Sequence, residues 1–596
     1  MNPSKRFVKI FLFISLVMFS LCSNLKKEKE LTKEDNEEIE KFTNKFLFES
    51  LSPLSSILGG KAVNSEKTCG YCKIAVAGIR QYVIEKHGFT GLNKFLTSLC
   101  TIALDEDVCA NAIDGYAPIF FKSITNNLLD EIQLCAKIKL CPEGAKYVNQ
   151  TEYAAQLLKS KPEKKREPID TKAKKWRMLQ LTDAHYDLYY KVGADVDCSK
   201  PLCCRDNNIT TSTNTLSGKF GYPGKCDINE NVFRSFLDAA EEAKPDFIIW
   251  TGDNAPHDVW MGSQEHVFNS TRILRDMLNE KFQHKIPIYP ILGNHEKYPN
   301  DEYGKDEKDL LAGMADLYKE YLDDAAYKQF KETGYYTMKH PNSNLRIIAL
   351  NCMECDTFNF NLIAEQTGAQ KMFLWLEQVL LQAEKDGEIV YILDHIPINA
   401  SFYLTQCALR LRALLDRFNY IIRGHFSGHT HQDDIVGVHS YFNASDIISI
   451  NYVAPALTTY SHKFPSFRVF EIDSNTKQVI DYEQYRLNVT DANIKGVAKW
   501  NLAYQATKFF DVKDLTEMKK MTEIDVEGDY ILMRYSETET AKKKMHKKST
   551  IRDAKCTVTN DNFDDYRICA HPKFGIDVNW LFQLLNHLCG KWKIMN

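Results

Sequence analysis

The chain has 596 residues, a formal net charge of −4 at pH 7, and charged residues at 26% of its positions. This near-neutral balance gives no reason to expect a nucleic-acid partner, and the length predicts more than one domain. Its 17 cysteines would be unusual in a reducing compartment, so we expect the secretory route and a secreted or lysosomal protein.

The N-terminal residues 1–23 indicate a cleaved signal peptide. Lys5 and Arg6 precede an apolar stretch, Ile10 to Cys22, that is short for a membrane span. Residues 24–64 are charged and then rich in serine and glycine, which indicates a leader. No later segment approaches ~20 uninterrupted apolar residues, so we expect a soluble mature protein. Six glycosylation sequons agree with this route: Asn149, Asn208, Asn269, Asn399, Asn443 and Asn488.

Residues 65–145 hold six cysteines within segments of helical apolar periodicity: Cys69, Cys72, Cys100, Cys109, Cys135 and Cys141. The pattern predicts a small helical unit stapled by disulfides, whose pairing the sequence leaves open. A zinc site is disfavoured because four of these cysteines lack zinc-like spacing.

The cysteine spacing resembles the saposin family. The resemblance implies the pairs Cys69–Cys141, Cys72–Cys135 and Cys100–Cys109, and it implies peripheral contact with a membrane through this unit. A disulfide staple without a lipid role is the alternative.

Residues 146–175 contain little to bury, and their run Lys159 to Pro168 is strongly basic. We expect a solvated linker. Contact of the basic run with anionic lipid is the alternative.

From residue 176 to about 490, short apolar strands alternate with amphipathic helices, which predicts a layered α/β catalytic domain. The expected helices are Val232 to Ala243, Phe268 to Phe282 and Met372 to Ala383. Residues 491–596 indicate a helical C-terminal domain without a catalytic constellation. The expected fold class is therefore α+β multidomain.

Five apolar runs of the catalytic domain end in polar residues, at the strand ends where α/β sheets carry their chemistry. The fragments are Asp183-x-His185, Gly252-Asp253, Gly293-Asn294-His295-Glu296, Asp394-His395 and Gly428-His429-x-His431. Residues two apart in an extended segment point the same way, so we expect Asp183 and His185 to face one centre. One such fragment alone is weak, because a core histidine is commoner than a ligand.

Taken together, the fragments offer seven ligands with Asp253 as the natural bridge: Asp183, His185, Asp253, Asn294, His395, His429 and His431. Such a set suits two divalent cations about 3.5–4 Å apart, an arrangement that clamps a phosphoryl group.

These fragments resemble the calcineurin-like metallophosphoesterase superfamily. Longer stretches resemble the acid sphingomyelinase family: Leu181 to Asp187, Pro201 to Arg205, Trp250 to Trp260 and Leu487 to Thr490. The resemblance implies one metal at Asp183, His185, Asp253 and His431, and a second at Asp253, Asn294, His395 and His429. It also implies zinc. The related purple acid phosphatases place an iron-binding tyrosine where this chain has Pro256, which counts against iron(III).

The activity that the resemblance implies is hydrolysis of sphingomyelin to ceramide and phosphocholine by a metal-activated hydroxide. His295 would then protonate the leaving alcohol, and His257 would stabilise charge on the phosphate oxygens. The alternative for both histidines is support of the metal ligands.

The resemblance further implies the disulfides Cys198–Cys203, Cys204–Cys226 and Cys355–Cys407. It leaves the pairing of Cys352, Cys556, Cys569 and Cys589 open.

The chain departs from the family near His395. Asp394 stands where the family has glycine, and could tune that histidine or face solvent. Asn399 forms a sequon in the same loop, where a glycan would crowd the substrate, so we do not expect it to be used.

Three functions compete. The first is a sphingomyelin phosphodiesterase acting on phospholipid at a membrane surface, expected as a monomer. The second is a secreted phosphodiesterase of soluble substrates such as nucleotides. The third is a lipid-binding or lipid-transfer protein, which has no evident need for a full set of metal ligands.

Overall fold

The computed structural model describes residues 104–127, 150–205, 215–304, 306–364, 369–399, 402–523 and 558–560, with isolated positions at 73, 93, 97, 100, 101, 555 and 556. The chain divides into two compact units. One comprises Met1–Tyr147 with Leu581–Lys593, and the other comprises Val148–Trp580 with Ile594–Asn596.

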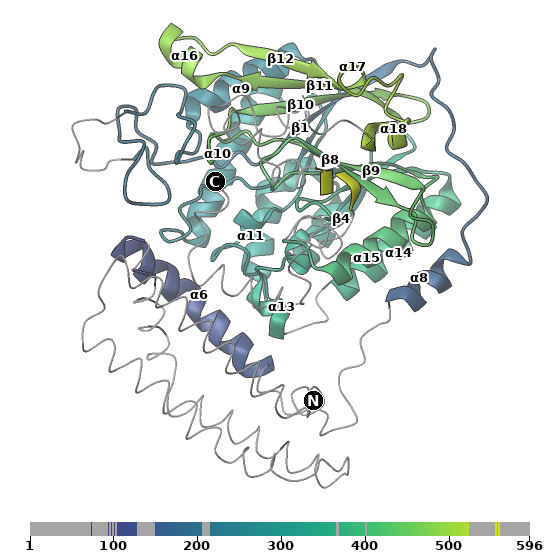
Figure 1. Ribbon diagram of the computed structural model, residues 1–596, viewed down its shortest axis with the longest axis horizontal. Coiled ribbons are helices and arrows are strands. Elements are labelled where there is room, and N and C mark those ends of the chain that lie inside the picture. The colour runs from purple at the N-terminus through teal and green to yellow at the C-terminus, as the bar shows by residue number, and fades with distance from the viewer. Residues whose placement is uncertain are drawn as a thin grey trace. The chain divides into compact units, whose positions relative to one another are not determined.

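The first unit contains helix α6, Glu106–Asn127, which Figure 1 draws in purple. A disulfide joins Cys109 of this helix to Cys100, one of the pairs that the saposin resemblance implies. The other four cysteines of residues 65–145 lie outside the described residues, so their pairing stays a prediction.

The second unit is built on two mixed six-stranded sheets. The first has the order β12-β11-β10-β1-β2-β3, with strands β1 Lys175–Leu181, β2 Phe247–Trp250, β3 Ile288–Pro290, β10 Ser466–Asp473, β11 Val479–Leu487 and β12 Trp500–Gln505. Strands β1, β2 and β3 run parallel. Strands β10, β11 and β12 extend the sheet by antiparallel pairing.

The second sheet has the order β4-β5-β6-β7-β9-β8, with strands β4 Tyr336–Lys339, β5 Leu345–Ala349, β6 Ile389–Leu393, β7 Ile422–Ser427, β8 Asp434–His439 and β9 Ile447–Val453. Its central strands β5, β6, β7 and β9 are parallel, and β4 and β8 pair antiparallel at the edges. Parallel strands covered on both faces read as continuous apolar runs, which is why β2 and β6 were recognisable in the sequence.

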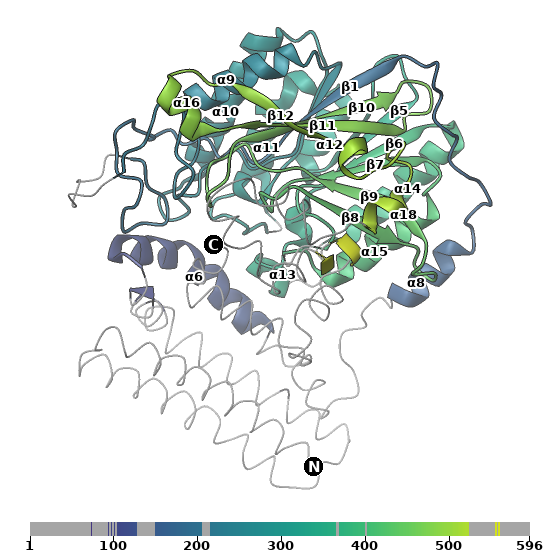
Figure 2. The ribbon, with the colours of Figure 1, turned by 45° about the horizontal axis from the view of Figure 1, so that its top comes forward.

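The two sheets face each other through aromatic side chains. Phe470 of β10 lies 5.0 Å from Phe426 of β7 and 5.5 Å from Tyr452 of β9, measured between ring centroids. Figures 1 and 2 show the sheets stacked, with α9 and α10 outside the first sheet and α14 and α15 outside the second. This four-layer arrangement confirms the expected α/β catalytic fold.

The helices begin where capping residues start them. Helix α9, Glu230–Glu242, is capped by Asn229, and α10, Gln264–Phe282, is capped by Ser263. Both therefore begin a few residues before their predicted starts, as does α14, Gln370–Asp386. The remaining helices are α8 Gln150–Leu158, α11 Lys308–Tyr318, α12 Asp324–Thr333, α13 Phe360–Ala364, α15 Thr405–Arg417, α16 Val489–Lys495, α17 Ala506–Phe509 and α18 Met518–Thr522, with short 3-10 turns at Asn294–Glu296, Lys319–Tyr321 and Cys352–Cys355.

The described part of the expected linker is docked rather than solvated. Helix α8 buries Ala154 and Leu157 and packs against α15. Tyr153 donates a hydrogen bond to Glu377. The guanidinium of Arg410 lies over the ring of Tyr153, 3.8 Å from the ring centroid.

Beyond α8, two side chains of the basic run contact distant segments of the same unit. Lys161 lies 2.6 Å from Asp416, and Arg166 donates to the backbone carbonyls of Asn419 and Ile448. The prediction of a free tether was wrong for Lys161 and Arg166, because both find acceptors far away in the sequence.

The second unit also continues past the expected boundary at residue 490. Strand β12 pairs with β11, and Tyr504 of β12 donates to Asp433. Helix α18 packs against β8 and β9. At residues 500–505 the chain is therefore a sheet strand rather than part of a separate helical domain.

Three further disulfides tie the second unit together: Cys198–Cys203, Cys204–Cys226 and Cys355–Cys407. These are the pairs that the family resemblance implies. Cys352 is a buried free thiol, and Cys556 is disulfide-bonded. Among the described residues, no helix is both long and apolar enough to cross a bilayer.

Candidate metal centre

The loops that follow β1, β2, β3, β6 and β7 meet at one edge of the stacked sheets, because these strands run parallel within each sheet. They bring together carboxylate, amide and imidazole groups that the sequence places far apart. Five of the seven predicted ligand residues are nearly or fully buried, and His429 and His431 are partly exposed.

The backbone that presents these groups is bent rather than extended. Asp183, His185, Asp253, His429 and His431 all have positive φ, between 43° and 68°. A non-glycine residue in this region costs roughly 1–2 kcal/mol, and such strain gathers at functional sites. Asp183 and His185 do approach one centre, as predicted. The reason we expected, that an extended segment points both side chains the same way, was wrong.

Close packing of the loops accompanies this bend. A side chain at Gly293 would overlap the carboxylate of Asp253, so the loop after β3 can lie against the loop after β2 only with glycine at this position.

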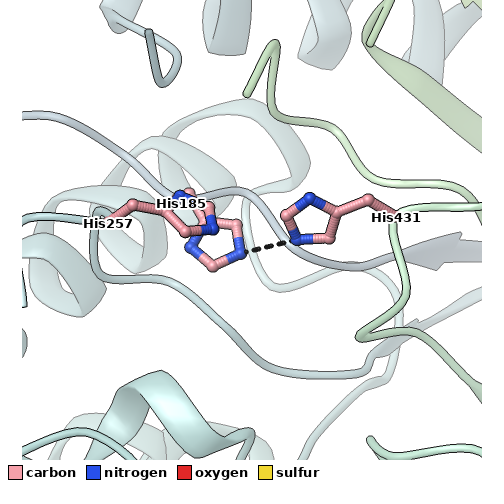
Figure 3. Close-up of side chains that lie close together, drawn as sticks. All are labelled: His185, His257 and His431. Atoms are coloured by element: carbon pink, nitrogen blue, oxygen red, sulfur yellow. Dashed lines mark hydrogen bonds between the residues drawn. The ribbon is translucent and has the colours of Figure 1, made fainter. Parts of the chain in front are cut away.

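One half of the centre gathers around His185. Its Nε2 atom lies 3.0 Å from Nε2 of His431 and 3.6 Å from Oδ2 of Asp253. His431 Nε2 is in turn 3.4 Å from Oδ1 of Asp183. Figure 3 shows the rings of His185 and His431 facing each other, with His257 beside His185.

The other half gathers around His395 and His429. His395 Nε2 lies 3.0 Å from Oδ2 of Asp253, and His429 Nδ1 lies 2.9 Å from Oδ1 of Asn294. The same Asp253 oxygen thus faces a histidine of each half, which is the position that a bridging ligand occupies.

The donor set fits two divalent cations. Nδ1 of His185 is 2.8 Å from the carbonyl of Ala255, and Nδ1 of His395 is 2.6 Å from that of Thr251. A carbonyl can only accept, so each Nδ1 carries the proton and each Nε2 is turned toward the centre, as in metal-ligating histidines. Nε2 of His429 is buried without a hydrogen-bond partner. An orphaned buried nitrogen is costly unless a cation or another ligand satisfies it.

Burial and neighbouring charges set the pKa values of the ligand side chains. Burial, with His257 and His295 nearby, lowers the pKa of His185 well below its ordinary value and keeps the ring neutral. Burial alone would raise the pKa of Asp253, but His395 and His295 hold it well below its usual range. For His395 burial acts in the opposite direction and would lower the pKa, but the carboxylates of Asp253 and Asp183 raise it to about 10. A proton therefore competes with a cation for the Nε2 atom of His395.

Two carboxylates that the sequence reasoning did not assign hold the ligand loops. Glu296 accepts from the backbone amides of Gly293, Asp253 and Asn254 at 2.5, 2.9 and 2.7 Å. Asp301 accepts from Nδ2 of Asn294 at 2.7 Å, which directs the Oδ1 atom of Asn294 toward His429. Glu296 follows His295 in the motif and could have been suspected, whereas nothing in the sequence singles out Asp301.

The two candidate catalytic histidines lie beside the ligands. His257 is 7% exposed, its ring centroid is 3.9 Å from that of His185, and Tyr460 stacks on its other side at 4.0 Å. His295 donates its backbone N–H to Asp253, and its buried Nδ1 has no hydrogen-bond partner. The side chain of Asp227, which the sequence did not reveal, pairs with Nδ1 of His257 at 2.8 Å.

The structure shows the surroundings of the two residues near His395 that depart from the family pattern, Asp394 and Asn399. Asp394 is fully buried and accepts from Tyr403 at 3.1 Å, so it does not face solvent, and burial raises its pKa to about 7. Asn399 is buried, in agreement with an unused sequon. Of the other sequons, Asn443 and Asn488 are exposed and Asn269 is half-buried on α10, while Asn149 and Asn208 lie outside the described residues.

Comparison with protein families assigns the two parts of the second unit. Residues 177–433, which include all seven predicted ligands, match the family described as calcineurin-like phosphoesterase. Residues 437–559 match the family described as acid sphingomyelin phosphodiesterase C-terminal region. The latter match begins in β8 and extends past β12, so it crosses the boundary that we expected at residue 490.

Similar curated proteins carry related names. The chain is 31% identical to Sphingomyelin phosphodiesterase A of Dictyostelium discoideum over 76% of this chain and 81% of the relative. It is 31% identical to Sphingomyelin phosphodiesterase of Homo sapiens over 56% of this chain and 54% of the relative. It is also 31% identical to Cyclic GMP-AMP phosphodiesterase SMPDL3A of Bos taurus over 56% of this chain and 76% of the relative. By its likeness to the first of these over most of both chains, and by its two matched regions, this chain belongs to the acid sphingomyelinase family of calcineurin-like phosphoesterases.

Proposed function

We propose that this protein is a metal-dependent phosphodiesterase that hydrolyses sphingomyelin to ceramide and phosphocholine. The observation that carries the proposal is the likeness to Sphingomyelin phosphodiesterase A, which extends over 76% of the chain. The cluster of carboxylates and imidazoles at the sheet edge supports the same function. Phosphodiester hydrolysis requires stabilisation of the negative charge that develops around phosphorus, and such a cluster can hold the cations that provide it.

The proposed metal ligands form two sets that share Asp253. Asp183, His185 and His431 would hold one cation with it, and Asn294, His395 and His429 would hold the second. Zinc is the metal that we propose, since it accepts this mixture of imidazole and carboxylate ligands. Two bound divalent cations would supply a water of lowered pKa and would neutralise the phosphodiester.

The proposed proton donor to the leaving alcohol is His295. Its ring lies next to the centre, and its Nδ1 is free of any protein hydrogen-bond partner, so a ring N–H is available to substrate. His257 is the proposed partner of the non-bridging phosphate oxygens. Asp227 fixes its Nδ1, which leaves Nε2 as the nitrogen that can reach a substrate.

Sphingomyelin lies in a bilayer, so the enzyme must meet a membrane. The proposed contact is peripheral and uses the saposin-like unit, residues 65–145, while the N-terminal signal sends the chain to a secreted or lysosomal location. We propose a monomer, with the exposed Asn443 and Asn488 as the sequons best placed to carry a glycan.

A second candidate function rests on the bovine relative. That protein is named as a cyclic GMP-AMP phosphodiesterase, and its likeness covers 56% of this chain. A soluble phosphodiester is therefore the alternative substrate. A lipid-transfer protein without activity would not need the converging ligand set.

The deciding experiment is a substrate panel with the purified full-length enzyme. Sphingomyelin vesicles, cyclic dinucleotides and bis-p-nitrophenyl phosphate would be compared by kcat/KM at equal metal content. Preference for sphingomyelin over dinucleotides supports the proposal, and the reverse preference supports the alternative.

A further inference from the structure

The disulfide Cys204–Cys226 stands directly before two buried charged residues. Its sulfurs join positions 22 residues apart, and both cysteines are fully buried. Arg205 follows the first cysteine and Asp227 follows the second. Each of these residues contacts a loop of the metal centre.

Arg205 connects the loops after β1 and β2. Its Nη2 atom lies 2.8 Å from Oδ1 of Asp187 and 2.8 Å from Oδ2 of Asp258, and its Nε donates to Oδ2 of Asp187 at 2.9 Å. Asp187 comes two residues after His185, and Asp258 comes directly after His257. Arg205 is 8% exposed, so this paired charge is shielded from solvent.

Asp227 holds His257 itself. One carboxylate oxygen lies 2.8 Å from Nδ1 of His257, and the other accepts the backbone N–H of His257 at 2.7 Å. Thr458 donates its hydroxyl to the same carboxylate at 2.7 Å. These contacts fix both the ring and the backbone of His257.

The backbone at the disulfide is tightly constrained. Cys204 has a φ of 62°, its N–H donates to the carbonyl of Asp195 at 3.0 Å, and its carbonyl accepts from Lys191 at 2.8 Å. The position of Arg205 therefore depends on a bend that few residues adopt and that the covalent bond to Cys226 helps to hold.

We propose that the Cys204–Cys226 disulfide is a positioning element of the active site, which sets His257 through Asp227 on one side and through Arg205 on the other. This inference rests on the proposed function only in giving His257 a part in phosphodiester hydrolysis. It assigns the disulfide a role beyond holding the fold.

The neighbouring disulfide Cys198–Cys203 is a matched control. It joins positions only 5 residues apart within the same segment. Lys225 contacts the backbone around it, but the hydrogen bonds of these two cysteines do not reach His257, Asp187 or Asp258.

A double-mutant cycle tests the proposal on bis-p-nitrophenyl phosphate, so that it does not depend on which natural substrate is correct. The variants are Cys204→Ala with Cys226→Ala, Asp227→Asn, and all three changes together, each checked for metal content and thermal unfolding. We expect each of the first two to lower kcat on the order of tenfold or more while both metals stay bound, and the combination to lose clearly less than the product of the two single effects. Cys198→Ala with Cys203→Ala should stay within about twofold of the native enzyme.

Losses that multiply would overturn the proposal, as would an equal loss in the Cys198 and Cys203 control. If the cysteine variant does not fold, phosphine reduction of the native enzyme provides the same test, with each disulfide followed by mass spectrometry. Activity must then fall in step with cleavage of Cys204–Cys226, before tryptophan fluorescence reports unfolding. Full activity after that cleavage would contradict the proposal.

Discussion

The carboxylate of Asp253 lies 3.0 Å from Nε2 of His395, and these two residues belong to loops of different sheets. The candidate metal centre thus spans the seam between the sheets. Its assembly requires both sheets to be folded and stacked, because neither contributes the full ligand set.

Replacing Asp253 should therefore empty both halves of the centre. Elemental analysis of the native protein should find about two transition-metal ions per chain, with zinc dominant, and Asp253→Ala should lower both occupancies. Asp238→Ala, an exposed change on α9, is the control and should keep both. Full occupancy in Asp253→Ala would contradict the bridging assignment.

Cation retention should weaken as the pH falls. Asp253 and Asp183 raise the pKa of His395 to about 10 against the effect of burial. Below that pH the ring is protonated when no cation is bound, so cation binding must displace a proton and is disfavoured further at each lower pH. Calorimetry in buffers of different ionisation enthalpy should detect this proton release. Binding that releases no proton between pH 6 and pH 8 would show that His395 is not a ligand.

His295→Ala should separate proton donation from metal binding. We expect both metals to remain, with a rate loss on the order of 10²–10⁴-fold for an alcohol leaving group. The loss should be much smaller with p-nitrophenolate, which leaves without a proton. Equal losses on the two substrates would instead assign His295 to charge stabilisation or structure.

Glu296→Gln should destabilise the fold around the ligand loops. The carboxylate accepts three backbone amides, and glutamine would turn an N–H₂ group toward at least one of them. Leaving buried donors unpaired costs roughly 1–3 kcal/mol, which thermal unfolding would detect. Glu265→Gln, on the exposed face of α10, should change the melting temperature little. An unchanged melting temperature for Glu296→Gln would exclude this role.

Removing the saposin-like unit should affect lipid and soluble substrates differently. Deleting residues 65–145 should lower turnover of sphingomyelin in vesicles far more than turnover of bis-p-nitrophenyl phosphate, provided that the protein stays folded and keeps its metals. An amphipathic unit gains about 25 cal/mol per Å² of apolar surface buried in lipid, which gives reversible membrane binding. Equal effects on both substrates would remove the lipid-presenting role.

The sequence predicted the candidate ligands better than their surroundings, and the reason is physical. Short apolar runs that stop at glycine and then show Asp, His or Asn carry a local signal, as around Asp253. The left-handed backbone of Asp183 and His185 carries no such signal, because it is imposed by packing between loops. Asp227 was missed for a related reason: its pairing with His257 depends on a contact between segments 30 residues apart.

Long-range pairing also explains the two boundary errors. Arg166 lies in a basic run with the composition of a solvated linker, whereas its hydrogen-bond acceptors, the backbone carbonyls of Asn419 and Ile448, lie far away in the sequence. Strand β12 lies at a sheet edge and none of its six residues is fully buried, so it lacks the apolar pattern by which buried strands are recognised.

Hydrolysis of sphingomyelin vesicles in ¹⁸O-labelled water tests the central claim most directly. The account predicts ceramide and phosphocholine as products, with the heavy oxygen in the phosphocholine because water attacks phosphorus, and no product from metal-depleted enzyme or Asp253→Ala. Absence of both products from metal-loaded native enzyme, or label in the ceramide hydroxyl, would contradict it.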